Sequence, residues 1–264
     1  MGRFAESIAQ YEKALKVDPN FVASHVGIAN DQIFLGKPQE ARKTLAKLEA
    51  IARNDGERRL ACTWAAASYL HEGYTKSALG EVERRYQIAK KGNDGVAMSA
   101  DLNLMGNILF EAGHADAALA KFNEGAAAID AADTTAEVKE ATHRNHLYDV
   151  ARVALLRKDV PSAAETAEQY RKQVEARKIP FEMWRTHELA GLLAFAKSDH
   201  ERAVRELEQA NHQDPRVLFA LGEAYAAGGK AESAKTAFAR AAGFNGLGIN
   251  YAYVRAKAQA KLKG

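Results

Sequence analysis

The sequence has one cysteine, five prolines and no long apolar run. The single thiol, Cys62, excludes an internal disulfide, and its apolar neighbours favour a buried structural role. So low a cysteine count fits a reducing compartment and slightly favours the cytoplasm. It does not establish the localisation. No window of 18 apolar residues occurs, so we expect no membrane span. The first residues enter a helical pattern with acidic Glu6, which is not typical of a secretory leader.

A strong charge of one sign is also missing. The 37 basic and 34 acidic side chains are interspersed, which leaves a formal charge of +3 and no basic stripe for nucleic acid. The chain has no glycine-rich phosphate loop, no nucleophile elbow and no paired cysteines for zinc. We therefore expect no catalytic residues, no cofactor and no nucleic-acid partner.

A recurring element fills the chain instead. Seven times a glycine-like break is followed by a short polar turn and a helix that opens on a small residue. The small residues are spaced by 34, 37, 40, 45, 40 and 31 positions, and they are Ser7, Ala41, Ala78, Ala118, Ala163, Ala203 and Ala234. Periods of this length indicate a stacked solenoid, in which a small residue lets paired helices approach closely.

Between the breaks, apolar residues recur at helical spacing and no stretch alternates with period two, so the chain is predicted to be all-α. The longest interval contains one extended helix over residues 134–157, which begins at the capping sequence Asp133-Thr134-Thr135. Trp64 and Trp184 lie in first helices of their repeats. We expect both to pack between neighbouring repeats.

Two repeats carry a more specific pattern. In one, the spaced residues are Leu218, Leu221-Gly222, Tyr225, Ala234, Phe238 and Ala241; in another they are Leu102, Met105-Gly106, Ala118 and Phe122. The pattern resembles the tetratricopeptide repeat, a helix-turn-helix unit of 34 residues. The resemblance implies a right-handed α-solenoid of antiparallel helix pairs, a superhelix with a C-terminal capping helix.

The repeat boundaries follow from the breaks. We expect a single repeat domain over residues 1–264: a half repeat at 2–20, repeats at about 21–55, 56–93, 95–133, 134–179, 180–214 and 215–245, and a capping helix at 248–262. The half repeat leaves an apolar face of Phe4, Ile8 and Tyr11 without its usual first helix. This predicts either a longer parent protein or self-association through that helix.

In the family that the chain resembles, first helices line a concave face that binds peptides. Carried onto this sequence, the resemblance assigns amides for backbone contacts, aromatic pockets and arginines for a carboxylate. The assigned groove residues are Asn30, Phe34, Asn103, Asn107, Phe110, Tyr148, Arg152 and Arg185. The carboxylate clamp of some members is incomplete here, because Val26 stands where a lysine is required.

These features favour a non-catalytic scaffold that binds a peptide or protein partner in its concave groove. A second hypothesis is a C-terminal regulatory or sensor array of a larger signalling or transcription-regulating protein. A third is a helical metalloenzyme centred on His143 and His146, since Glu140 and His143 form half of a carboxylate-bridged metal motif. No second Glu-x-x-His occurs, so we assign no metal ligands.

Overall fold

The fold is an array of helices. The computed structural model describes residues 2–246 and 248–263, and within them it has fourteen α-helices and no strand. None of the described helices combines the length and the apolar character needed to cross a bilayer. The helices are α1 (Phe4–Val17), α2 (Val22–Phe34), α3 (Pro38–Ile51), α4 (Asp55–His71), α5 (Thr75–Lys91), α6 (Gly95–Glu111), α7 (Ala115–Ala131), α8 (Ala136–Leu156), α9 (Val160–Arg177), α10 (Pro180–Ala196), α11 (His200–Leu207), α12 (Pro215–Ala227), α13 (Ala231–Ala242) and α14 (Ile249–Lys261).

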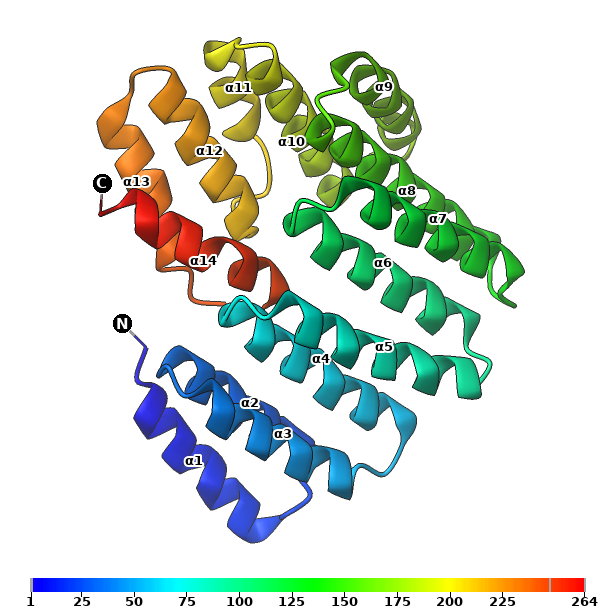
Figure 1. The fold of residues 1–264 in the computed structure, drawn as a ribbon, viewed down its shortest axis with the longest axis vertical. Helices are drawn as coiled ribbons and strands as arrows, with labels where there is room; N and C mark the ends of the chain where they lie inside the picture. Colours follow the sequence, from blue (N-terminus) through cyan, green and yellow to red (C-terminus); the bar gives the residue numbers. More distant parts are fainter. Residues whose placement is uncertain (1, 247, 264) are drawn as a thin grey trace.

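Successive helices pack side by side as an α-solenoid, which confirms the predicted fold class (Figure 1). The tight turns inside the pairs share a left-handed residue, such as Gly113 with φ of 83°. Lys158 and Ser198 take the same conformation with φ of 62° and 60°, although a side chain makes it costly. The turn is therefore preserved where the sequence lacks the glycine.

The predicted small residues lie where paired helices meet. Ala41, Ala78, Ala118, Ala163 and Ala203 are completely buried. Close approach at these points leaves no room for a larger side chain, so the prediction from spacing is confirmed for them. Ser7, on the terminal helix α1, is only partly buried.

Helix α8 begins at the predicted cap, where the Thr135 hydroxyl accepts a hydrogen bond from the Val138 amide at 3.3 Å. The prediction for Trp184 is wrong, because its side chain is 42% exposed. A buried ion pair joins α8 to α10 near this position, and in it Arg144 donates two hydrogen bonds of 3.0 Å to Glu182. Trp64 is partly buried against the core formed by α2, α3 and α4.

Helix α1 packs on α2. The Phe4 ring stacks on Phe34 with ring centres 4.6 Å apart, and Tyr11 lies against the backbone of Gly27. The predicted apolar face of α1 is thus partly used inside the chain, since two of its three residues contact α2. No side chain of α1 is fully buried, however.

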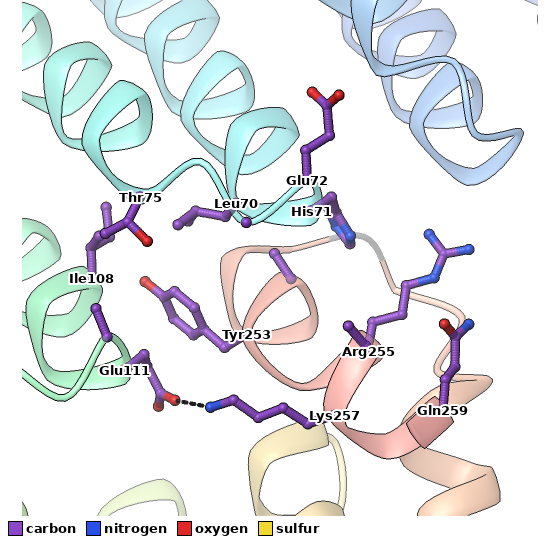
Figure 2. Close-up of a pocket in the computed structure, with 14 residues that line it drawn as sticks. Leu70, His71, Glu72, Thr75, Ile108, Glu111, Tyr253, Arg255, Lys257 and Gln259 are labelled. Carbon is purple, nitrogen blue, oxygen red and sulfur yellow. Dashed lines mark ion pairs between the residues drawn. The ribbon is translucent and has the colours of Figure 1, made fainter. Parts of the chain in front are cut away.

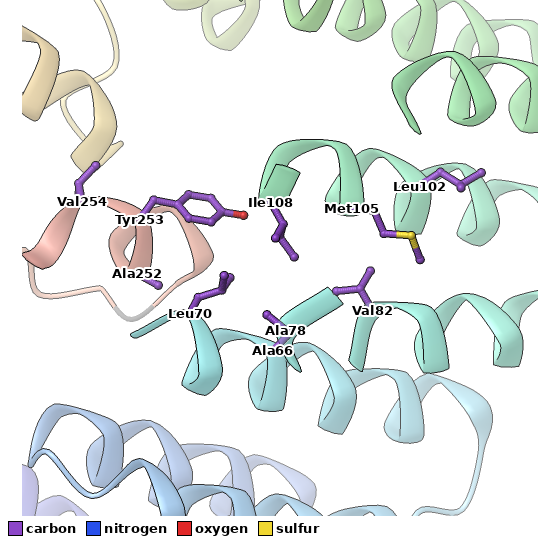
Figure 3. Close-up of a cluster of buried hydrophobic side chains, with 10 residues drawn as sticks. All are labelled: Ala66, Leu70, Ala78, Val82, Leu102, Met105, Ile108, Ala252, Tyr253 and Val254. Atoms are coloured by element: carbon purple, nitrogen blue, oxygen red, sulfur yellow. The ribbon is translucent and has the colours of Figure 1, made fainter. Parts of the chain in front are cut away.

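The last helix does more than cover the end of the array. Figure 1 shows α14 lying between α12 and α13 on one side and α4 on the other, so it joins segments almost 200 residues apart. Its residues Ala252, Tyr253 and Val254 are buried in one cluster with Leu70 of α4 and Ile108 of α6 (Figure 3). Helix α14 thereby closes the curved array across its inner side.

Candidate functional site

The inner side of the array holds a polar cavity of about 430 Å³ between α6, α8, α10 and α14. We call it the central cavity. Its lining is unusually rich in amides and arginines for a helical interior, which fits hydrogen bonding to a peptide-like ligand. Its polar lining residues are Ser99, Asn103, Asn107, Thr142, Asn145, Tyr148, Asp149, Arg152, Arg185, Arg216, Asn250 and Tyr253.

A second cavity of about 530 Å³ lies beside it, and we call it the lateral cavity. It is bordered by Trp64 of α4, Phe181 of α10 and the segment that leads into α14. Arg185, Arg216 and Asn250 line both cavities. The two cavities therefore meet at a set of polar side chains drawn from α10, α12 and α14.

Arg152 is the centre of a buried polar network. It is 4% exposed and donates hydrogen bonds to Asn107 at 3.0 Å and to Asp149 at 3.1 Å. Its guanidinium also lies over the Phe110 ring, 4.2 Å from the ring centre, and pairs with Glu111 at 3.5 Å. An arginine held by this many contacts has little freedom to engage a partner.

A second part of the network ties α14 to the start of α12. The Asp214 carboxylate caps α12 by accepting from the Arg216 amide at 2.9 Å, and it pairs with the Arg216 guanidinium at 2.7 Å. Asn250 of α14 donates to the same carboxylate at 2.9 Å. Burial alone would raise the pKa of Asp214, but the charge and hydrogen bonds of Arg216 outweigh burial and lower this pKa.

Burial acts the other way on the remaining acids. Desolvation raises the pKa of Asp149 and of Glu188, although the nearby Arg152 and Arg216 charges oppose it. Tyr148 donates a hydrogen bond of 2.8 Å to Glu188, and burial raises the pKa of this hydroxyl as well. These groups form a fixed and nearly balanced set of charges rather than an open basic patch.

The predicted groove residues divide into two groups. The central cavity brings together five of them: Asn103, Asn107, Tyr148, Arg152 and Arg185. Phe34 instead lines a separate cavity of about 740 Å³ between the two ends of the array. Phe110 lies beneath Arg152, and the side-chain oxygen of Asn30 is buried without a partner in the described part of the chain.

Arg185 differs from the other inner arginines. It stacks on the rings of Tyr148 and Phe181, with distances of 4.6 and 4.5 Å to the ring centres, and donates to the side-chain oxygen of Asn145. Among the described residues it forms no ion pair, whereas Arg144, Arg152 and Arg216 all do. Its position is fixed by aromatic stacking while its charge stays available.

A further cavity of about 470 Å³ lies between α14 and the ends of α4 and α6 (Figure 2). Figure 2 shows Lys257 of α14 reaching Glu111, and these side chains pair at 3.7 Å. His71 also lines this cavity, where burial lowers its pKa to about 4 and the Arg255 charge acts in the same direction.

The histidines proposed for a metal centre do not converge with other ligands. His143 lies 2.8 Å from the carboxylate of Asp130, and burial followed by the His143 charge lowers the pKa of His146. In residues 2–246 and 248–263, no three His, Cys, Asp or Glu side chains come close enough together to hold an ion.

Three residues of the inner network were not predicted from the sequence: Asp149, Asp214 and Arg216. Charged residues on an amphipathic helix usually face solvent, so helical periodicity did not indicate that these three face the inner network. For Asp214 the sequence indicated only a helix cap, because an aspartate before Pro215 is a typical helix start. It did not indicate which other side chains this carboxylate contacts.

Comparison with known proteins finds a family match in the N-terminal part of the chain. Residues 1–63 match the family model described as tetratricopeptide repeat. These residues therefore resemble a tetratricopeptide repeat. No curated protein matches the sequence.

Solved structures share the fold over nearly the whole chain. A tetratricopeptide repeat protein from Parabacteroides merdae has 15% identity and a TM-score of 0.60, with 98% of this chain and 91% of that chain covered. The APC/C hetero-tetramer Cut9-Hcn1 gives 14% identity and a TM-score of 0.55, with 99% and 46% covered. A STAND protein with a tetratricopeptide repeat sensor, PH0952 from Pyrococcus horikoshii, has 18% identity and a TM-score of 0.53. The match covers 96% of this chain and 41% of that chain. At these identities the likeness concerns the fold.

Proposed function

We propose that this chain is a non-catalytic scaffold that binds a peptide or protein partner on its concave face. The proposal depends mainly on one observation, the pair of adjoining polar cavities that meet at Arg185, Arg216 and Asn250. Amides there offer donors and acceptors to a peptide backbone. Arg185, which lacks an ion pair among the described residues, supplies a charge for a carboxylate of the partner.

A steric block tests this proposal without removing any polar contact. Ala100 is an exposed residue of α6 that borders the central cavity, so Ala100→Trp fills part of that space. Ala127→Trp, at an exposed position of α7 in the same repeat, is the matched control. Proteins captured from native extract by the immobilised wild-type chain are expected to bind Ala127→Trp and to be lost with Ala100→Trp. Equal capture by both variants would contradict binding at this face.

A second candidate is a sensor array within a larger signalling protein. It is favoured by the structural neighbour PH0952, which is described as having a tetratricopeptide repeat sensor. This chain matches 41% of that protein, so the sensor is part of a larger molecule there. The size of the native product distinguishes the two candidates, and an antibody against this array measures it on a denaturing gel. A product much larger than 28.7 kDa is expected for the sensor candidate, and one of that size would contradict it.

Self-association through α1 is a further part of the proposal on partners. Its support is the exposure of apolar side chains at and after the end of this helix, with Val17 88% and Phe21 48% exposed. Light scattering over a range of concentrations tests it. The average mass is expected to rise with concentration for the wild type and to stay at one chain for Val17→Asp.

A further inference from the structure

Helix α14 occupies the inner face of the array and leaves open clefts beside it. Four cavities border this one helix of 13 residues, with volumes of about 430, 470, 530 and 740 Å³. The side chains that α14 turns toward the 470 Å³ cavity include two small ones, Ala252 and Ala256. These cavities are open clefts beside the helix, so space for larger side chains remains there although the central residues of α14 are buried.

The polar contacts of α14 are also incomplete. The Tyr253 hydroxyl is buried, and none of the described residues bonds to it, which carries a desolvation cost. Lys257 pairs with Glu111 at 3.7 Å and Lys261 with Glu223 at 2.8 Å, but both lysines are about half exposed. Exposed pairs of this kind add little stability.

The segment before α14 is rich in glycine. Gly243, Gly246 and Gly248 lie between the end of α13 and the start of α14, and glycine restricts backbone rotation least. Ala252, Tyr253 and Val254 belong to a buried cluster that includes residues of α4 and α6. Helix α14 also packs on α13, where the Tyr251 hydroxyl donates to the Ala242 carbonyl at 2.6 Å. Undocking α14 would therefore break its contacts with α4, α12 and α13, while the linker would keep it tethered to α13.

The surface beneath α14 determines which kind of helix can bind there. Leu70 and Ile108 provide an apolar floor, and Glu111 and Glu223 place carboxylates opposite the lysines of α14. An amphipathic helix with basic side chains matches this arrangement, and larger apolar side chains at the positions of Ala252 and Ala256 would fill the cavity that α14 leaves.

We propose that the seat of α14 is a helix-binding surface, and that α14 is a built-in, exchangeable occupant which a basic amphipathic helix of a partner displaces. This inference deepens the proposed function and rests on it for the identity of the concave face. The seat is narrower than that face, because it comprises the surfaces of α4, α12 and α13 that α14 contacts, together with Ile108 of α6, rather than the polar cavities alone.

A synthetic peptide with the sequence of residues 248–263, labelled at its amino terminus, is the probe for fluorescence anisotropy. The full-length Tyr253→Ala chain, whose own α14 is weakened, is expected to bind this peptide at least tenfold more tightly than the wild-type chain. The reason is that a seated α14 lowers the fraction of competent molecules. A peptide carrying Ala256→Leu is expected to bind more tightly than the native sequence, and one carrying Tyr253→Ala is expected not to bind.

A second weakened chain, Lys257→Ala with Lys261→Ala, replaces Tyr253→Ala if the latter does not fold. Absence of peptide binding to every folded, weakened chain would overturn the proposal, as would equal binding of the Tyr253→Ala peptide. A stable dimer that the peptide does not dissociate would also overturn it, because a second copy would then be the occupant. Capture that depends on Ala100 would still support the proposed function in each of these cases, so the two failures are distinguishable.

Discussion

At the scale of single residues, the array depends on positions where a side chain would be too large. An added Cβ at Gly222 would lie 2.5 Å from the Phe238 ring, and one at Gly106 would lie at the same distance from the Phe122 ring. Phe122 and Phe238 are almost completely buried. The Leu-Gly and Met-Gly pairs of the repeat pattern therefore exist because a phenylalanine of the paired helix fills the space beside the glycine.

The variant Gly222→Ala should measure this constraint. Overpacking in a core costs about 1–3 kcal/mol, partly offset by the better helix propensity of alanine, so we expect a net loss of about 1–2 kcal/mol. Gly80→Ala is the matched control, because Gly80 is helical, exposed and has nothing within 4 Å of the added Cβ. This control should gain up to about 1 kcal/mol. Urea unfolding measures both, and equal effects would contradict the packing argument.

His71 should make stability depend on pH. Burial lowers its pKa from 6.5 to about 4, so below pH 6.5 the unfolded chain takes up a proton that the folded chain refuses. Stability then falls as the pH decreases from 6.5 toward 4, by about 2 kcal/mol. The His71→Leu variant should lose this part of the pH dependence. Urea unfolding at pH 7 and 4.5 measures it, with His114→Leu at an exposed position as control. An unchanged difference between the two pH values in His71→Leu would contradict the assignment.

At the scale of helices, the caps combine a local task with a tertiary one. Asp199 accepts a hydrogen bond from the Arg202 amide at 3.1 Å and thereby only starts α11. Asp214 starts α12 and also holds the Arg216 guanidinium and the Asn250 amide of α14. An aspartate at the N-cap thus makes more tertiary contacts in α12 than in α11.

Asp214→Ala and Asp199→Ala should separate these tasks. Loss of a cap costs about 1 kcal/mol, which is the expected effect of Asp199→Ala. Asp214→Ala also leaves a largely buried guanidinium without its nearest carboxylate, and a loss of about 3 kcal/mol is expected. Thermal and urea unfolding of the two variants give the comparison. A loss for Asp214→Ala that is no larger than that for Asp199→Ala would show that the tertiary contacts are unimportant.

At the scale of the whole molecule, α14 changes how the repeats are coupled. An open solenoid transmits stability only between neighbouring repeats. Here Tyr253 contacts the cluster that includes Leu70 of α4 and Ile108 of α6, so the last helix supports the second and third repeats directly (Figure 3). A change in α14 should therefore be felt at distant positions.

Tyr253→Ala tests this coupling. Removal of the buried ring is expected to cost about 3–5 kcal/mol and to speed amide hydrogen exchange in α4 and α6 as well as in α14. Exchange in α9, which has no extensive contact with α14, should stay unchanged. Tyr253→Phe keeps the ring and removes a hydroxyl without a partner among the described residues, so its stability should be equal or higher. Faster exchange confined to α14 would contradict the coupling.

The sequence was sufficient for the repeat and for the local structure. Helical periodicity, the turn residues and the small residues such as Ala118 and Ala163 are short-range requirements, and they predicted the helices and their close contacts. It also suggested that Asn103, Asn107 and Arg185 face inward, and the structure places them in one cavity.

Only the tertiary structure decided which inner residues remain available and where α14 lies. Arg152 and Arg185 look alike in the sequence, yet Arg152 is held by Asp149 and Arg185 stacks without an ion pair in the described part of the chain. The physical reason is that the curvature of the array brings α4, α12 and α14 together. Curvature is the sum of small rotations between repeats, and no local pattern of residues specifies that sum.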